Sequence, residues 1–205
     1  MKKIDEGSKY PNERFQERKQ HKYCFIGPSI RPVTSEMEKT AEKTVYISMG
    51  TVVKNHEIYQ NCLEVLGNTE YQVIISLGDH ELEYDSFPEN VKVYRSVDQM
   101  AVLSIAYVFL THCGMNSASE ALYFEVPLVM LPQTPEQGAV ARRVEELGAG
   151  KKLKSGSKEE ILQVIETVLS DGRYKAAASE ISAGFKKSGG AKAAKEYLEK
   201  LIHAY

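Results

Sequence analysis

The feature that most constrains the fold is an alternation of short apolar segments with segments of helical spacing, which runs from residue 43 to residue 203. The apolar segments are nearly continuous, as is typical of strands buried on both faces of a parallel sheet. The helical segments between them would cover those two faces. The sequence therefore predicts an α/β fold with a Rossmann-like, doubly wound parallel sheet. We predict strands at 43–49, 71–77, 91–95, 106–111, 127–132 and 150–153, and helices at 55–67, 98–104, 116–124, 136–148, 157–170, 172–186 and 190–203.

The N-terminal part of the chain departs from this alternation. Residues 1–22 are polar and lack periodicity, which predicts an extended or disordered arm. Residues 22–32 predict a short strand or edge segment, stopped by Gly27 and Pro28. We therefore expect an arm over 1–22 and one domain over 23–205, which includes the C-terminal helices.

The composition restricts the partners and the compartment. The chain has 205 residues and a formal net charge of −2, which gives no electrostatic reason to expect nucleic acid or an anionic membrane as a partner. Its three cysteines form no CxxC pair, which favours a reducing compartment over a disulfide framework. No apolar run approaches the ~20 residues that cross a bilayer, and the polar N-terminus has no signal region. We therefore expect a cytoplasmic protein without a membrane span.

The stretch FLTHCGMNSASEALYFEVPLVMLPQTPEQ, residues 109–137, places polar groups at the ends of two predicted strands. In doubly wound sheets, ligands bind outside the carboxyl ends of the strands. His112 ends the first strand, Gly114 lets the backbone approach a ligand closely, and Asn116 and Ser117 open a helix. A helix N-terminus offers unpaired N–H donors and a partial positive charge. This turn therefore predicts a phosphate site.

Two carboxylates extend the predicted site. Glu120 lies one turn into the helix and could accept hydrogen bonds from vicinal hydroxyls, such as those of a ribose. Glu136 and Gln137 follow the second strand and would reach the same edge of the sheet, where they could bind further hydroxyls. Simpler interpretations stay open for single residues: Ser117 and Glu120 fit a capping box, His112 fits a packed histidine, and Glu136 fits a first-turn acid. The joint placement of these residues favours a nucleotide-type site.

The runs THCGMNSASEAL and VPLVMLPQTPEQ resemble the donor-binding signature of family 1 GT-B glycosyltransferases, which include plant secondary-product enzymes and bacterial macrolide glycosyltransferases. Upstream, FIGPSI, VYISMGTV and SVDQMAVL resemble successive blocks of the macrolide-type subgroup. Downstream, ARRVEELGAGKKL and SGGAKAAKEYLEKL fit as well. The resemblance covers about residues 22–203. It implies one of the two Rossmann-like halves of a GT-B fold, with a nucleotide-sugar as the donor substrate.

The resemblance assigns roles by position. It implies that the donor diphosphate is bound by His112, Gly114, Asn116, Ser117 and Thr51, the nucleoside by Ser96, Val97, Gln99 and Glu120, and the transferred sugar by Glu136 and Gln137. Such contacts stabilise the charge that develops on the departing nucleoside diphosphate. The family needs no metal for this step, and the histidines show no metal-ligand spacing. We therefore expect no metal and no other cofactor.

Two positions depart from the family pattern. Ser96 stands where most members carry an aromatic residue that stacks on the base, and Arg95 is the substitute that we consider for stacking. Glu125 replaces the glycine that usually precedes Val-Pro. A left-handed backbone at Glu125 would cost about 1 kcal/mol or more, so we expect a rearranged turn.

The other half of a GT-B enzyme normally supplies the acceptor pocket and the general base, usually a histidine. This chain starts near the expected interdomain linker, so the resemblance implies no catalytic residue in it and little or no sugar transfer by it alone. Expected partners are an N-terminal acceptor-binding domain or subunit, or a second copy of the chain. The alternative function is a non-catalytic nucleotide-sugar binding module or a subunit of a split enzyme.

Other enzyme classes are disfavoured. A cysteine hydrolase would need His112 and Cys113 as a dyad, but neighbouring residues at a strand end point in opposite directions. The chain has no GxSxG elbow for a serine hydrolase. No GxGxxG opens the first helix, which argues against a dehydrogenase.

Overall fold

The computed structural model describes residues 24–37, 42–50, 56–79 and 86–202. The predicted alternation of strands and helices is confirmed, with small shifts at the element ends. The elements are β1 (Thr44–Ser48), α2 (His56–Leu66), β2 (Gln72–Ser76), β3 (Val91–Tyr94), α3 (Gln99–Ile105), β4 (Ala106–Thr111), α4 (Met115–Tyr123), β5 (Leu128–Met130), α5 (Pro135–Glu146), β6 (Gly150–Lys152), α6 (Lys158–Ser170), α7 (Gly172–Ser188) and α8 (Gly190–Ile202). The predicted arm over 1–22 lies outside the described residues.

The strands form one sheet in the order β3-β2-β1-β4-β5-β6, and every neighbouring pair is parallel. The doubly wound, Rossmann-like parallel sheet that the sequence predicts is confirmed. The strand order reverses between β1 and β4, where Ser48 pairs with Thr111. Thr111 also pairs with Met130 of β5, so three strands end at one edge. Ligands of such sheets bind at this switch point.

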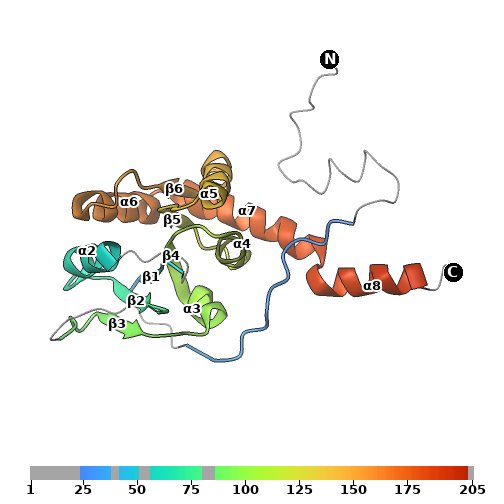
Figure 1. Cartoon of the computed structure of the whole chain (residues 1–205), viewed down its shortest axis with the longest axis horizontal. Coiled ribbons are helices and arrows are strands. Elements are labelled where there is room, and N and C mark those ends of the chain that lie inside the picture. The colour runs from blue at the N-terminus through green and yellow to red at the C-terminus, as the bar shows by residue number, and fades with distance from the viewer. Residues whose placement is uncertain (1–23, 38–41, 51–55, 80–85, 203–205) are drawn as a thin grey trace, which may run out of the picture.

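Alternating side chains of the central strands bury both faces of the sheet. In β1, Val45 and Ile47 belong to a core cluster with residues of α2 and α6, while Tyr46 belongs to a second cluster with residues of α3, α4, α5 and α7. Figure 1 shows how these helices are arranged around the sheet. Tyr46 stacks on Phe109 of β4, with ring centroids 4.5 Å apart. Because both faces are covered, the strands read as continuous apolar runs instead of alternating with polar residues.

The prediction of a strand at 22–32 is wrong for the described residues. Residues 24–37, which we call the linker segment, form no strand and run past α7 to the start of α3 (Figure 1, blue). Pro28 has no N–H to give to a ladder. The carbonyl of Ile26 instead accepts a hydrogen bond from the N–H of Gly190, 2.8 Å away, at the start of α8. The linker segment is therefore held by a hydrogen bond to a residue distant in sequence, Gly190, and not by pairing with an edge strand.

The turn after α4 contains a non-glycine residue in the left-handed conformation, Glu125. Glu125 has a φ of 64°, so the expected rearrangement of this turn is wrong. The side chain and carbonyl of Glu125 bind groups of α7, which offset the cost of the left-handed backbone.

Candidate functional site

The turn between β4 and α4 contains two adjacent residues, His112 and Cys113, whose side chains have different environments. Cys113 has a φ of 65°, a left-handed conformation that is uncommon outside glycine. Its thiol is buried and belongs to the same core cluster as Tyr46 and Phe109. Burial raises the pKa of Cys113 to about 12, and the nearby carboxylate of Glu136 acts in the same direction. A buried, protonated thiol is no nucleophile, which agrees with the exclusion of a cysteine hydrolase.

The ring of His112 lies between two glycines. A Cβ atom on Gly50 would lie 2.6 Å from Cε1 of His112, and one on Gly114 would lie 2.7 Å from its Nε2. Both positions therefore need glycine for this ring placement. Burial lowers the pKa of His112, although the backbone of Ser48 and the carboxylate of Glu136 favour the protonated ring. His112 is thus mostly neutral at pH 7, and its Nδ1 is buried without a hydrogen-bond partner among the described residues.

The N-terminus of α4 is open. Its N-cap is Gly114, no side chain caps it, and the first backbone bond runs from the N–H of Ala118 to the carbonyl of Gly114. The preceding N–H groups, including those of Asn116 and Ser117, have no carbonyl one turn back to bind. Since Ser117 lies inside the first turn, the alternative of a Ser117–Glu120 capping box is not formed. Free donors therefore point to the switch point beside His112.

Two residues predicted to bind the nucleoside meet at the same edge. The side-chain amide of Gln99, at the start of α3, donates to the carboxylate of Glu120 on α4. The hydroxyl of Tyr46 in turn donates to the amide oxygen of Gln99 at 3.1 Å. Of the other two, Ser96 is exposed and Val97 packs partly against the core. The Tyr46–Gln99–Glu120 chain fixes a carboxylate where a ribose hydroxyl could donate to it.

The start of α5 is capped by its own glutamine. Thr134 and Gln137 form a capping box, in which the amide oxygen of Gln137 accepts from the N–H groups of Gln133 (2.8 Å) and Thr134 (3.2 Å). That oxygen is therefore occupied, and only the NH₂ group of Gln137 is left for a sugar. Glu136 is exposed at this edge and close enough to His112 to affect its pKa.

Sequence reasoning missed Gln133. Its amide nitrogen and oxygen are both buried without a partner among the described residues, the same condition as Nδ1 of His112. Buried polar groups are nearly always paired, which makes Gln133 a further candidate for contact with water, a ligand or another part of the chain. The signal that could have found it is its position: Gln133 directly follows the predicted strand at 127–132, and the corresponding strand β5 ends at the site. Thr51, which was predicted to contact the diphosphate, lies outside the described residues.

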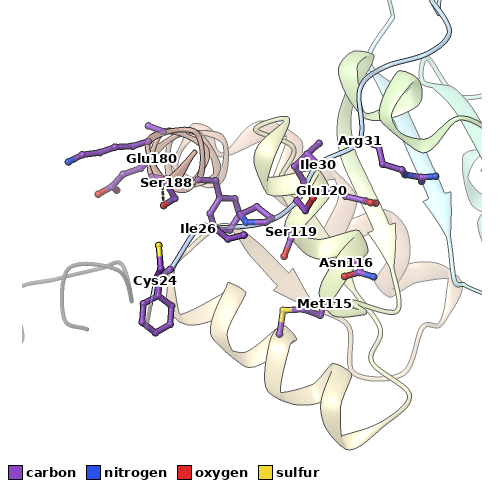
Figure 2. A pocket seen from close by; sticks show the side chains of 18 residues that line it. Cys24, Ile26, Ile30, Arg31, Met115, Asn116, Ser119, Glu120, Glu180 and Ser188 are labelled. Carbon is purple, nitrogen blue, oxygen red and sulfur yellow. Dashed lines mark hydrogen bonds between the residues drawn. The ribbon is translucent and has the colours of Figure 1, made fainter. Parts of the chain in front are cut away.

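The linker segment, α4 and α7 enclose an open hollow of about 1280 Å³, which we call the linker hollow (Figure 2). Asn116 and Glu120 of the predicted site line it together with Arg31 of the linker segment. Figure 2 shows these three residues at one end of the hollow, while Cys24 and Glu180 lie at the other. The predicted donor site therefore continues into the linker hollow.

The described residues contain neither a metal-binding cluster nor a membrane-spanning helix. No group of His, Cys, Asp and Glu side chains there is arranged to hold a metal ion. None of the helices there is long and apolar enough to cross a membrane.

Comparisons with known proteins agree with this geometry. A sequence model described as UDP-glucoronosyl and UDP-glucosyl transferase matches residues 28–188. The uncharacterized UDP-glucosyltransferase YojK of Bacillus subtilis is 38% identical over 91% of this chain and 47% of its own length. The NDP-glycosyltransferase YjiC of Bacillus licheniformis is 34% identical over 93% of this chain and 50% of its own length.

Solved structures give the same answer. The glycotransferase of kitacinnamycin superimposes with a TM-score of 0.79 and 29% identity, over 86% of this chain and 49% of its own length. The chain thus spans about half the length of the relatives it matches, as one Rossmann-like half of a GT-B fold. On its sequence and on its fold, this chain belongs to the UDP-glucoronosyl and UDP-glucosyl transferase family of glycosyltransferases.

Proposed function

We propose that the chain is the donor-binding half of an inverting glycosyltransferase, which transfers a sugar from a nucleotide diphosphate sugar to a hydroxyl of a small acceptor. A UDP-sugar is the donor that the family membership favours. The observation that carries the proposal is the open N-terminus of α4 beside His112, with the Gln99–Glu120 pair at the same edge. These groups suit a diphosphate and a ribose respectively.

The diphosphate is the leaving group, so donors that bind it more tightly as its charge grows promote transfer. The N–H groups of the first turn of α4, including those of Asn116 and Ser117, supply such donors. His112 is mostly neutral and acts as a hydrogen-bond donor in the tautomer that carries the Nε2 proton. This arrangement stabilises the leaving group by protein donors without a metal ion.

Further contacts orient the donor. Glu120 accepts hydrogen bonds from the ribose hydroxyls, and Gln99 holds its carboxylate in place. Glu136 and the NH₂ group of Gln137 bind hydroxyls of the transferred sugar. The acceptor pocket and the general base belong to the remaining half of a protein of the relatives' length, as a domain, a separate subunit or a second copy. This chain alone then binds donor with little or no transfer.

A non-catalytic nucleotide-sugar binding module is the second candidate. The exposed side chain of Ser96, in place of an aromatic residue that stacks on the base, favours it. Donor binding without transfer, even after the N-terminal half of a relative is supplied, would select this candidate over the first.

The proposal is tested by calorimetric titration of the chain with UDP, dTDP and GDP, repeated with His112→Ala. We expect one nucleotide to bind and its Kd to rise about 10-fold or more in the variant, the effect of removing a hydrogen bond to a charged group. An unchanged melting temperature shows that the variant is folded. No binding of any nucleotide by the folded wild-type chain would contradict the proposal.

A further inference from the structure

Among the described residues that we assign to the donor diphosphate and its sugar, none is a lysine or an arginine. The titratable residues of the predicted donor site in the described part of the chain are Glu120, Glu136 and His112, and burial lowers the pKa of His112. The site thus offers two carboxylates and a mostly neutral ring to a ligand that carries at least two negative charges. Phosphate oxygens are usually bound by Arg or Lys as well as by backbone donors. A cation from outside the β4–α4 turn would balance the charge of the site.

Arg31 is placed to supply this charge. It lines the linker hollow together with Asn116 of the first turn of α4 and with Glu120. In Figure 2 these three side chains lie at the same end of the hollow. Lys187 of α7 lines the hollow as well. Its neighbour Ser188 marks the opposite end, away from the open helix terminus.

The position of Arg31 is fixed by anchors on both sides. On one side, the carbonyl of Ile26 accepts from the N–H of Gly190 at 2.8 Å. On the other, Asp98 accepts from the N–H of Thr34 at 3.1 Å, and from the hydroxyls of Thr34 and Ser35. These hydrogen bonds, led by that of the Thr34 hydroxyl, hold the pKa of Asp98 well below its usual range, so the anchor stays charged. Arg31 therefore sits on a segment tied to α8 and α3.

Arg31 also keeps its charge available. Its side chain is exposed, and no ion pair joins it to a carboxylate of the described residues. Two cations of α7 are, in contrast, already paired: Lys186 lies 3.4 Å from Glu125, and Arg173 lies 2.7 Å from Asp171. A bound diphosphate would meet an unpaired guanidinium.

We propose that Arg31 is a donor-binding residue whose guanidinium contacts the diphosphate of the nucleotide held at the start of α4. The inference rests on the proposed function and adds a residue of the linker segment to the donor site. The competing interpretation is a solvated arginine without a ligand. The planar guanidinium can bind two phosphate oxygens at once, which distinguishes it from a lysine at the same position.

The test compares the UDP affinity of the wild-type chain with that of Arg31→Gln, Arg31→Lys and Arg142→Gln by calorimetry. Arg142 is an exposed arginine of α5 that does not line the hollow, so its variant controls for the loss of one positive charge. We expect Arg31→Gln to raise the Kd roughly 10-fold or more, Arg31→Lys to raise it less, and Arg142→Gln to change it less than about 2-fold. Ligand-observed NMR with uridine adds a phosphate-free probe, whose binding Arg31→Gln should leave unchanged.

Three results would overturn the inference. If Arg31→Gln matches Arg142→Gln while His112→Ala loses UDP, the proposed function stands and Arg31 is no part of the site. If uridine and UDP weaken equally in Arg31→Gln, the residue contacts the nucleoside and not the diphosphate. If the folded wild-type chain binds no UDP, the proposed function fails and this inference fails with it.

Discussion

The hydroxyl of Ser179 on α7 donates a hydrogen bond to the carboxylate of Glu125, 3.0 Å away, although 54 residues separate the two in sequence. The ammonium group of Lys175 donates to the backbone carbonyl of Glu125 at 2.8 Å. The hydrogen bond from Ser179 and the charges of Lys186 and Lys175 hold the pKa of Glu125 below its usual value. A left-handed residue that replaces a glycine is thus tied to the helix packed beside it.

This relationship predicts an order of stability for two variants of Glu125. Glu125→Gly loses the side-chain contacts but relieves the left-handed backbone, so its free energy of unfolding should stay within about 1 kcal/mol of wild type. Glu125→Ala loses the same contacts and keeps the strain, so it should be about 1 kcal/mol less stable than Glu125→Gly. Urea denaturation measures both. Equal stability of the two variants would show that the backbone at this position is not strained.

The lowered pKa of a second carboxylate, that of Glu160, predicts that the stability of the fold depends on pH. Burial alone would raise the pKa of Glu160, but the backbone N–H groups of Lys154, Ser155 and Gly156 lower it to about 2. Because the folded pKa lies below the unfolded value, the stabilisation is present above about pH 4.5 and is lost as the pH falls towards 2. Glu160→Gln should therefore be about 1 kcal/mol less stable than wild type at pH 7, with a gap that closes towards pH 2.

Urea denaturation of wild type and Glu160→Gln at pH 7, 4 and 3 checks this expectation. Glu159→Gln is the matched control, because Glu159 is the exposed neighbour on the same helix. A stability gap between wild type and Glu160→Gln that stays constant over this range would mean that the hydrogen bonds do not depend on the charge of Glu160.

The doubly wound parallel sheet could be predicted from the sequence because it depends on local patterns, whereas the place of the donor site stays a prediction. Apolar runs alternating with helical spacing specify a parallel sheet, and the polar residues after β4 and β5 then fall at one edge. The exact start of α4 could not be predicted in this way. Its N-cap is Gly114, a residue without a capping side chain, while Ser117 and Glu120 offered a better match to a capping motif.

Contacts between distant segments explain the errors. Residues 22–32 were predicted as a short strand or edge segment, but the carbonyl of Ile26 binds the N–H of Gly190, which lies far along the chain. The turn at Glu125 is a similar case. The sequence shows that Glu125 replaces a glycine, but it does not show that Ser179 of α7 binds its carboxylate. The side-chain amide of Gln133 is buried without a partner among the described residues, and this burial depends on tertiary packing that the sequence does not show.

The hydrogen bond between Gln99 and Glu120 predicts that loss of the Gln99 side chain weakens binding of the nucleotide. Gln99→Ala removes the donor that holds the Glu120 carboxylate and also leaves the Tyr46 hydroxyl without its acceptor. We expect the Kd for UDP to rise about 3- to 10-fold, as for the loss of one ordinary hydrogen bond. Gln163→Ala, on the exposed side of α6, is the matched control. An equal Kd for the two variants would remove Gln99 from the site.

The packing of His112 against Gly114 predicts that a single methyl group disables the site. Gly114 has a φ of −61°, which alanine adopts freely, so Gly114→Ala acts by contact alone. Its Cβ would lie 2.7 Å from Nε2 of His112, and the ring must move away from the start of α4. We expect the Kd for UDP to rise about 10-fold or more, with a loss of stability of about 1–3 kcal/mol from overpacking.

Calorimetry with UDP and urea denaturation of the same preparations separate the two effects of Gly114→Ala. Gly172→Ala is the control, because a Cβ on Gly172 would meet no atom within 4 Å at the start of α7. It should bind UDP like wild type and be slightly more stable, since alanine favours a helix over glycine by roughly 0.5–1 kcal/mol. If Gly114→Ala binds UDP as tightly as Gly172→Ala, the position of the His112 ring is not what the nucleotide requires. The open helix terminus alone would then account for donor binding.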